Sequence, residues 1–161
     1  MRPRVSAAKP SRCHTARVVN VLGLAVTESC GVSALVPTVD GVRLLDSVAA
    51  FEESQGFTPA GAYAGLVPAH LRCGDLVDYY RGIERAQVPE GGHVWLLGCD
   101  CGEVSCWPLE AEVTLTEQSV RWSGFTQPYR PAWSYSGFGP FVFDRRQYEH
   151  AVSEAAAALG A

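Results

Sequence analysis

Within residues 33–56, the spacing of the hydrophobic residues changes from the alternation of a strand to a period of nearly four, which is that of a helix. The β-branched stretch 33–39 predicts a short strand, and the Asp40-Gly41 pair that follows it predicts a hairpin turn. Beyond this turn, apolar residues recur at helical spacing: Leu44, Leu45, Val48 and Phe51. Because Gly56 comes shortly after this stripe, we expect an amphipathic helix that ends there.

A second helix is predicted by a capping residue. The carboxylate of Asp75 can accept hydrogen bonds from the free amides of a helix N-terminus, so we expect a helix from there to about Arg85. Three apolar residues at helical spacing are expected to face inward: Leu76, Tyr79 and Ile83. The preceding stretch 58–69 is rich in Pro, Gly and Ala and predicts a loop.

Residues 93–125 alternate between apolar and polar side chains and predict a three-stranded antiparallel meander, with strands at 93–99, 106–115 and 119–125. One face of the second strand is apolar and is expected to face the core: Trp107, Leu109, Ala111, Val113 and Leu115. We expect Leu115 to pair with Val120. That register places Val113 opposite Trp122, an aromatic and β-branched pair of the kind that stabilises antiparallel sheets.

The last helix has signals at both ends. Asp144 is a good N-cap, Gln147 completes a capping-box arrangement, and Gly160 marks the end. The predicted fold is α+β: an antiparallel three-stranded meander with a cysteine hairpin loop, flanked by two or three helices including this C-terminal one. We place one domain at 32–161 and treat 1–31 as a basic N-terminal extension that we expect to be poorly ordered.

Composition narrows the classes of partner. A chain of 161 residues that is 47% hydrophobic can bury a core without covalent staples. Its net charge of −4 argues against nucleic acid as a partner, because such proteins carry clustered positive charge. No apolar run approaches the ~20 residues of a membrane helix. We therefore expect a cytoplasmic protein with neither nucleic acid nor membrane as partner. Almost all of the basic residues are arginines, and Lys9 is the sole lysine. This usage favours a bacterial, actinobacterial source.

Three of the six cysteines fall within the eight residues from 99 to 106: Cys99, Cys101 and Cys106. Thiolates this close can hold zinc or another thiophilic metal, and the glycine between them allows a tight turn. Zinc takes four ligands, and Cys73, beside Gly74 at a predicted helix start, is the candidate for the fourth. Asp100, Glu103 or water are alternatives. The pattern predicts a metal site with a structural or accessory role.

Two other interpretations of the cysteines remain open. The predicted hairpin places Cys99 opposite Cys106, where the two can form a disulfide, with Cys101 as the attacking or resolving thiol. The protein would then be a thiol-redox protein or a small oxidoreductase, so the sequence leaves open whether it is an enzyme. The third interpretation makes the cysteines small buried hydrophobes without chemistry.

Aromatic residues form a second group, with eight of them between positions 122 and 143: Trp122, Phe125, Tyr129, Trp133, Tyr135, Phe138, Phe141 and Phe143. Such residues can line a groove for a small molecule or a peptide, in which an arginine holds a carboxylate or phosphate, although they more often form core. The candidate ligand-binding residues are Trp107, Arg130, Trp133 and Tyr135. A protein-interaction module that uses this aromatic loop is thus a further alternative.

The cysteine segment also carries a resemblance. The run from Gly98 to Leu109 reads GCxCGExxCWPL, and it is followed by Trp122, Phe125, Pro128, Arg130, Trp133 and the segment 139–144. This combination resembles a family of small actinobacterial proteins that has no established activity. The similarity extends from about Ala34 to the C-terminal helix. The resemblance supports the domain limits and implies no mechanism.

Overall fold

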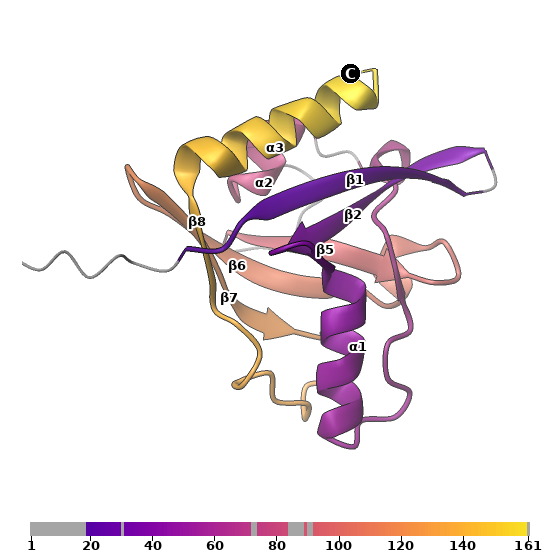
Figure 1. Ribbon diagram of the computed structural model, residues 1–161. Coiled ribbons are helices and arrows are strands. Elements are labelled where there is room, and N and C mark those ends of the chain that lie inside the picture. Colours follow the sequence, from indigo (N-terminus) through magenta and orange to yellow (C-terminus); the bar gives the residue numbers. More distant parts are fainter. Residues whose placement is uncertain (1–18, 30, 72–73, 84–88, 90–91, 161) are drawn as a thin grey trace, which may run out of the picture.

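The computed structural model describes residues 19–29, 31–71, 74–83, 89 and 92–160 (Figure 1). Its strands are β1 (Leu22–Ser29), β2 (Val32–Val39), β3 (Val42–Arg43), β4 (Tyr63–Ala64), β5 (His93–Cys99), β6 (Leu109–Leu115), β7 (Ser119–Thr126) and β8 (Phe141–Asp144). Its α-helices are α1 (Leu44–Ser54), α2 (Leu76–Tyr80) and α3 (Arg145–Ala158), with short 3-10 helices η1 (Pro68–His70) and η2 (Val104–Cys106). The α+β prediction is confirmed.

The predicted meander forms the centre of a larger sheet, whose strand order is β4-β5-β6-β7-β8 with antiparallel neighbours. Its expected register is confirmed, because Leu115 pairs with Val120 and Val113 with Trp122. The apolar face of β6 is also inward, with Leu109 and Ala111 fully buried. Strands β4 and β8 were not expected, and they extend the meander at its two edges.

The N-terminal strand belongs to a second antiparallel sheet, of order β1-β2-β3. Strand β1 lies within the segment 1–31 that the sequence pattern places outside the domain, yet it pairs with β2 from Leu22 opposite Val39 onward. The side chain of Gln147 makes two hydrogen bonds to this strand. Its amide Nε2 donates to the Leu22 carbonyl at 2.7 Å, and its Oε1 accepts from the Leu22 amide at 3.0 Å. The capping-box pattern assigns the Gln147 side chain to the N-terminus of the last helix. In the structure this side chain binds β1 instead.

Helices α1 and α3 begin and end near their predicted limits, whereas α2 is shorter than expected. Asp75 caps α2 as predicted, since its carboxylate accepts from the Asp78 amide at 3.0 Å. The helix stops at Tyr80 and not near residue 85, because Gly82 adopts a left-handed backbone with φ of +72°. Ile83 is consequently 41% exposed and does not face inward.

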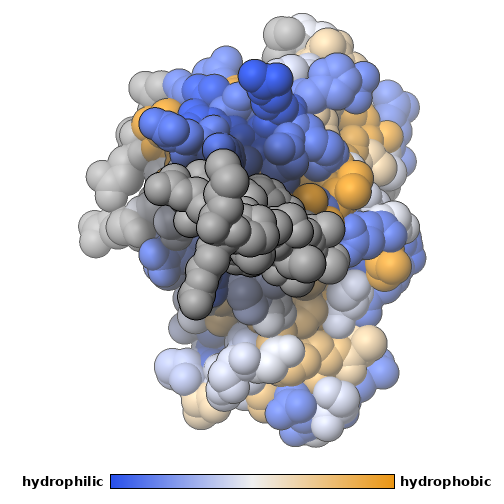
Figure 2. All heavy atoms as spheres, turned by 60° about the vertical axis from the view of Figure 1, so that its left-hand side comes forward, coloured by the Kyte–Doolittle hydropathy of each residue, from blue (hydrophilic) through white to orange (hydrophobic). Residues whose placement is uncertain are grey.

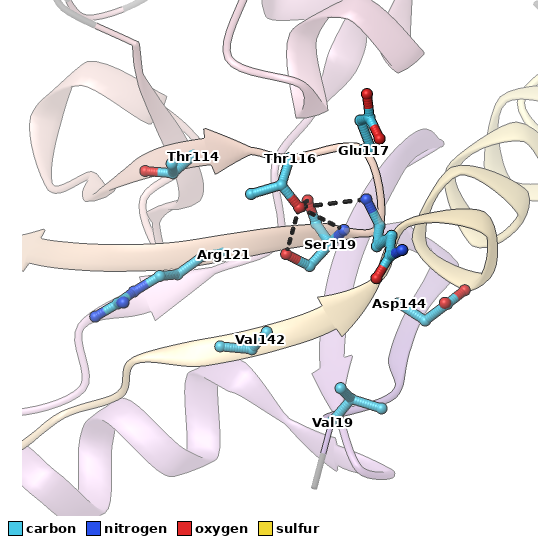
Figure 3. Close-up of a pocket in the computed structure, with 9 residues that line it drawn as sticks. Val19, Thr114, Thr116, Glu117, Ser119, Arg121, Val142 and Asp144 are labelled. Atoms are coloured by element: carbon cyan, nitrogen blue, oxygen red, sulfur yellow. Dashed lines mark hydrogen bonds between the residues drawn. The ribbon is translucent and has the colours of Figure 1, made fainter. Parts of the chain in front are cut away.

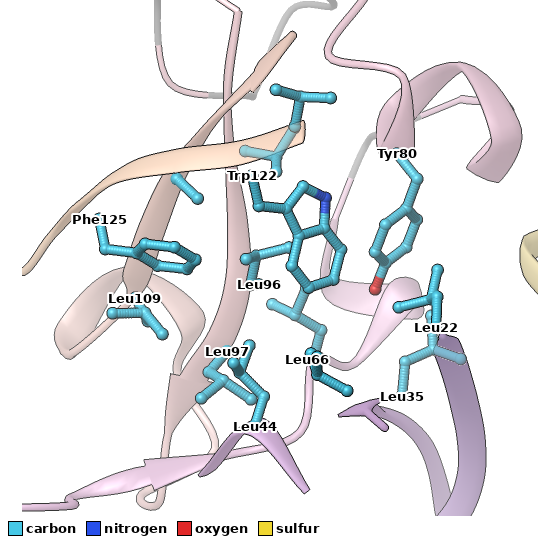
Figure 4. Close-up of a cluster of buried hydrophobic side chains, with 14 of the residues drawn as sticks. Leu22, Leu35, Leu44, Leu66, Tyr80, Leu96, Leu97, Leu109, Trp122 and Phe125 are labelled. Carbon is cyan, nitrogen blue, oxygen red and sulfur yellow. The ribbon is translucent and has the colours of Figure 1, made fainter. Parts of the chain in front are cut away.

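The core lies between the two sheets and α3, which covers β1 and α2 at the top of the view in Figure 1. Figure 4 shows leucines from several elements gathered around the ring of Trp122. The Trp122 indole Nε1 donates to the Tyr148 hydroxyl at 3.0 Å, and that hydroxyl donates to the Tyr80 carbonyl at 2.6 Å. These bonds join β7, α3 and α2 inside the core. Among the described residues, no helix is long and apolar enough to cross a membrane.

Candidate metal centre

The cysteine loop folds back on the end of strand β5. The Asp100 amide donates to the Ala62 carbonyl at 3.2 Å, and the Gly102 amide donates to the Cys99 carbonyl at 3.1 Å. Gly102 has φ of +96°, a conformation that glycine adopts without strain. Gly98 has a separate role, since a Cβ there would lie 3.3 Å from the Cα of Val104. The two glycines let η2 return against the strand that carries Cys99.

The cysteines meet through these turns and not through the predicted cross-strand pair. Strand β6 begins at Leu109, which pairs with Leu97, so Cys106 lies outside the ladder. Cys99 instead pairs with Tyr63 of β4. The expected pairing of Cys99 with Cys106 is therefore wrong. The residues ahead of β6 leave the sheet because Val104–Cys106 forms a 3-10 turn and Pro108 has no amide hydrogen to donate to a ladder.

The three sulfurs nevertheless converge. The Sγ atoms of Cys99, Cys101 and Cys106 all lie within 4.8 Å of one another, and all three are free cysteines. In a tetrahedral zinc site with Zn–S bonds of about 2.3 Å, the sulfurs are about 3.8 Å apart. Small side-chain adjustments therefore suffice to bring the three sulfurs onto one ion. Cys99 is buried at the base of the loop, whereas the other two are exposed.

The thiols differ in how readily they ionise. Burial raises the pKa of Cys99 to about 12, because desolvation disfavours the thiolate. The pKa of Cys101 is lowered, first by a hydrogen bond from the Glu103 backbone and then by the Cys99 side chain. Cys101 therefore ionises more readily than Cys99. Cys99 loses its proton only when an ion compensates for the burial, so metal binding at this loop is coupled to proton release.

The fourth ligand is not identified among the described residues. Cys73, the predicted candidate, lies outside them, and its role stays a prediction. No described His, Asp or Glu brings a ligand atom within 4.8 Å of all three sulfurs. Asp100 is the nearest described candidate for the fourth ligand, since its Oδ1 accepts from the Cys99 thiol at 3.6 Å. The described residues therefore supply three soft donors and one neighbouring carboxylate.

Three of the four predicted ligand-binding residues gather next to the loop. Trp107 follows Cys106 directly and is buried, and the guanidinium Cζ of Arg130 lies 4.9 Å from the centre of its ring. Trp133 meets the same ring edge-on, with centroids 5.8 Å apart, and stacks on Phe57 at 4.6 Å. The Trp107 indole nitrogen has no hydrogen-bond partner among the described residues. Ligand binding by this group stays a prediction.

The fourth such residue, Tyr135, belongs to a buried polar cluster that we did not predict from the sequence. At its centre is Glu52 of α1, which is fully buried. Its Oε1 accepts from the hydroxyls of Tyr63 and Tyr135, each at 2.6 Å, and its Oε2 accepts from the Gly61 amide at 2.7 Å. Burial, followed by the hydrogen bond to Glu52, raises the pKa of both tyrosines. Since Tyr63 pairs with Cys99, this cluster also fixes the strand that flanks the cysteine loop.

A signal for Glu52 was present in the sequence. The buried residues of α1 are Leu44, Val48 and Glu52, which follow one another at a spacing of four. By its spacing, Glu52 therefore belongs to the buried row of the helix. Its charge alone predicts an exposed position. A carboxylate at such a position requires buried donors, which Tyr63 and the more distant Tyr135 supply.

A large pocket lies elsewhere. It has a volume of about 690 Å³ and is lined by Val19, Thr114, Thr116, Glu117, Gln118, Ser119, Arg121, Val142 and Asp144. Figure 3 shows Thr116 and Ser119 bonded to each other within the β6–β7 turn, where their hydroxyls are 2.8 Å apart. None of the three clustered cysteines lines it. The cysteine loop therefore remains the strongest candidate site.

Comparison with protein-family models, with curated proteins and with solved structures finds no match. The functional argument consequently depends on the geometry of the cysteine loop.

Proposed function

We propose that the loop from Gly98 to Trp107 binds zinc or another thiophilic metal ion through Cys99, Cys101 and Cys106, in a structural or accessory role. The observation that supports this most is the convergence of three sulfurs within 4.8 Å on a loop of ten residues. Soft thiolate ligands select ions such as zinc and copper(I) over hard cations.

Exposure favours a chemical role over inert packing. A cysteine that acts as a small hydrophobe is buried, whereas Cys101 and Cys106 are exposed at the tip of a loop. All three thiols are free, which is the state that metal binding requires. A bound ion would join the end of β5 to η2 across the loop. Most of the hydrophobic core lies outside the loop, which contributes Cys99 and Trp107 to it, so a bound ion would add to a fold that already has a core.

Metal binding can be tested on the purified, reduced chain. We expect about one zinc per chain after zinc loading and removal of excess metal, with the three loop thiols protected from a thiol reagent until a chelator is added. The variant with Cys99, Cys101 and Cys106 all replaced by Ser should lose the zinc. The matched control carries Cys13→Ser and Cys30→Ser and should keep it. Equal zinc content in both variants would overturn the proposal.

A thiol-redox function is the second candidate, and the surroundings of Cys101 favour it. Cys101 is exposed, its pKa is lowered, and two further sulfurs lie within 4.8 Å, close enough to act as resolving thiols after modest movement. We expect Cys101 to be alkylated at neutral pH before Cys99 in the metal-free protein. A loop that forms an internal disulfide in a mild thiol–disulfide buffer, and holds no metal, would favour redox chemistry over the metal site.

The interaction-module alternative has weaker support. Figure 2 shows one face on which hydrophilic residues gather in the upper half and residues of mixed hydropathy cover the lower half. The large hydrophobic residues exposed in the described part of the chain are scattered: Val19, Val21, Val42, Ile83 and Tyr129. Most of the aromatic residues from 122 to 143 are buried and pack on one another.

A further inference from the structure

We infer that the cysteine loop favours trivalent thiophilic ions, arsenic(III) and antimony(III), which complete their coordination with three thiolates. The inference rests on the proposed function, since it requires the three cysteines to hold one ion, and it adds the class of that ion. Two properties of the loop support it: the number and placement of the donors, and the charge around them.

The donor set matches a pyramidal ion. Among the described residues only three ligand atoms converge, with Cys99 buried at the base and Cys101 and Cys106 at the solvent-exposed rim. A zinc ion held there needs a fourth ligand from solvent, from Asp100 or from elsewhere in the chain. Arsenic(III) carries a lone pair in that position and needs no fourth donor. The three sulfurs are therefore a complete ligand set for arsenic(III) and an incomplete one for zinc.

The charge of the loop points the same way. Residues 98–108 contain two acids, Asp100 and Glu103, and neither lysine nor arginine, and the guanidinium of Arg130 lies over the Trp107 ring of this segment. Three thiolates around a divalent ion leave one negative charge beside these carboxylates, whereas three thiolates around a trivalent ion leave none. Because like charges at close range disfavour one another, the two carboxylates destabilise the anionic zinc complex and leave the neutral complex unaffected.

Capture of arsenic(III) is a balanced exchange that needs no oxidant or reductant. In neutral arsenous acid, arsenic carries three hydroxyl groups. Each cysteine thiol forms one As–S bond as one As–O bond breaks, and the thiol proton leaves with the hydroxyl group as water. Three thiols and one arsenous acid thus give one trithiolate complex and three waters. Antimony(III) hydroxide reacts in the same way.

The test uses the full chain and arsenite as the probe. The cluster-only variant carries Cys13→Ser, Cys30→Ser and Cys73→Ser, so that Cys99, Cys101 and Cys106 are its sole thiols. We expect it to bind one arsenic with the loss of three free thiols and the appearance of near-ultraviolet As–S absorbance. Cys101→Ser in this background should weaken arsenite binding by more than the roughly 10–100-fold that follows loss of an outer-shell contact at a metal site.

A second variant separates the two ions. Asp100→Asn in the cluster-only background removes the nearest described carboxylate without removing a sulfur. Arsenite affinity should be unchanged, because its complex is neutral, whereas zinc affinity should rise, because the anionic zinc complex loses a neighbouring negative charge. Loss of two thiols per arsenic, or arsenite affinity insensitive to Cys101→Ser, would overturn the inference. If zinc still binds through the loop in that case, the proposed function stands. If neither ion binds, both fail.

Discussion

Replacement of Glu52 by glutamine probes the buried polar cluster that holds α1, β4 and the aromatic loop together. The amide keeps one oxygen, which can still accept from Tyr63 and Tyr135. Its NH₂ group takes the place of Oε2 and faces the Gly61 amide, which donates to that oxygen at 2.7 Å in the native protein. Two donors then oppose each other in a site that is closed to water.

The expected cost follows from these three contacts. Loss of a hydrogen bond to a charged acceptor costs about 1.5–3 kcal/mol. The two bonds from the phenols also weaken, because a neutral acceptor binds roughly half as strongly as an ionised one. We therefore expect Glu52→Gln to lower the free energy of unfolding by about 3–4 kcal/mol, a large share of the roughly 5–15 kcal/mol of a typical domain.

Urea unfolding followed by tryptophan fluorescence measures this loss, provided that the slopes of the two transitions agree. Glu53→Gln is the matched control, because it makes the same chemical change on the same helix at an exposed position. The control should stay within about 0.5 kcal/mol of the native protein. Equal midpoints for the two variants would refute the role assigned to Glu52.

Three further predictions test other parts of the fold. Gly98→Ala places a Cβ 3.3 Å from the Cα of Val104 and should lower zinc affinity roughly 10–100-fold, as a shift of supporting structure does; unchanged affinity in a metal titration contradicts it. Tyr148→Phe should cost about 2–3 kcal/mol in urea unfolding, because it strands the buried indole N–H of Trp122; a loss below about 0.5 kcal/mol, the scale of surface substitutions, contradicts it. The two arginines beside Glu149 hold its pKa below the usual 4.5. A lowered pKa stabilises the fold above that value and ceases to do so as pH falls through the folded pKa, so Glu149→Gln should be less stable than native at pH 7 and equal to it in acid; a difference that persists in acid contradicts it.

The sequence predicted best the elements whose signals are local. The alternation on β6 placed Val113 opposite Trp122, because a strand with one buried face allows only one register. The caps of α2 and α3 were predicted because Asp75 and Asp144 each act within one helical turn. Convergence of the three cysteines was also predicted, since a loop of eight residues keeps them close in any compact conformation.

The remainder depends on contacts between distant residues. Strand β4 has two residues and no periodicity, and it exists because β5 offers an edge at Gly98 and Cys99. The buried position of Glu52 depends on Tyr135, which lies more than eighty residues away. The route by which Cys106 reaches Cys99 was wrong in the prediction, because the 3-10 turn ahead of β6 has no alternating pattern.

The central claim is that the three cysteines of the loop hold one thiophilic ion. X-ray absorption at the zinc edge of the zinc-loaded cluster-only variant tests it most directly. We expect three sulfur neighbours at about 2.3 Å and one lighter atom. A shell of oxygen and nitrogen alone, or a spectrum unchanged when Cys99, Cys101 and Cys106 are all replaced by Ser, would contradict the claim.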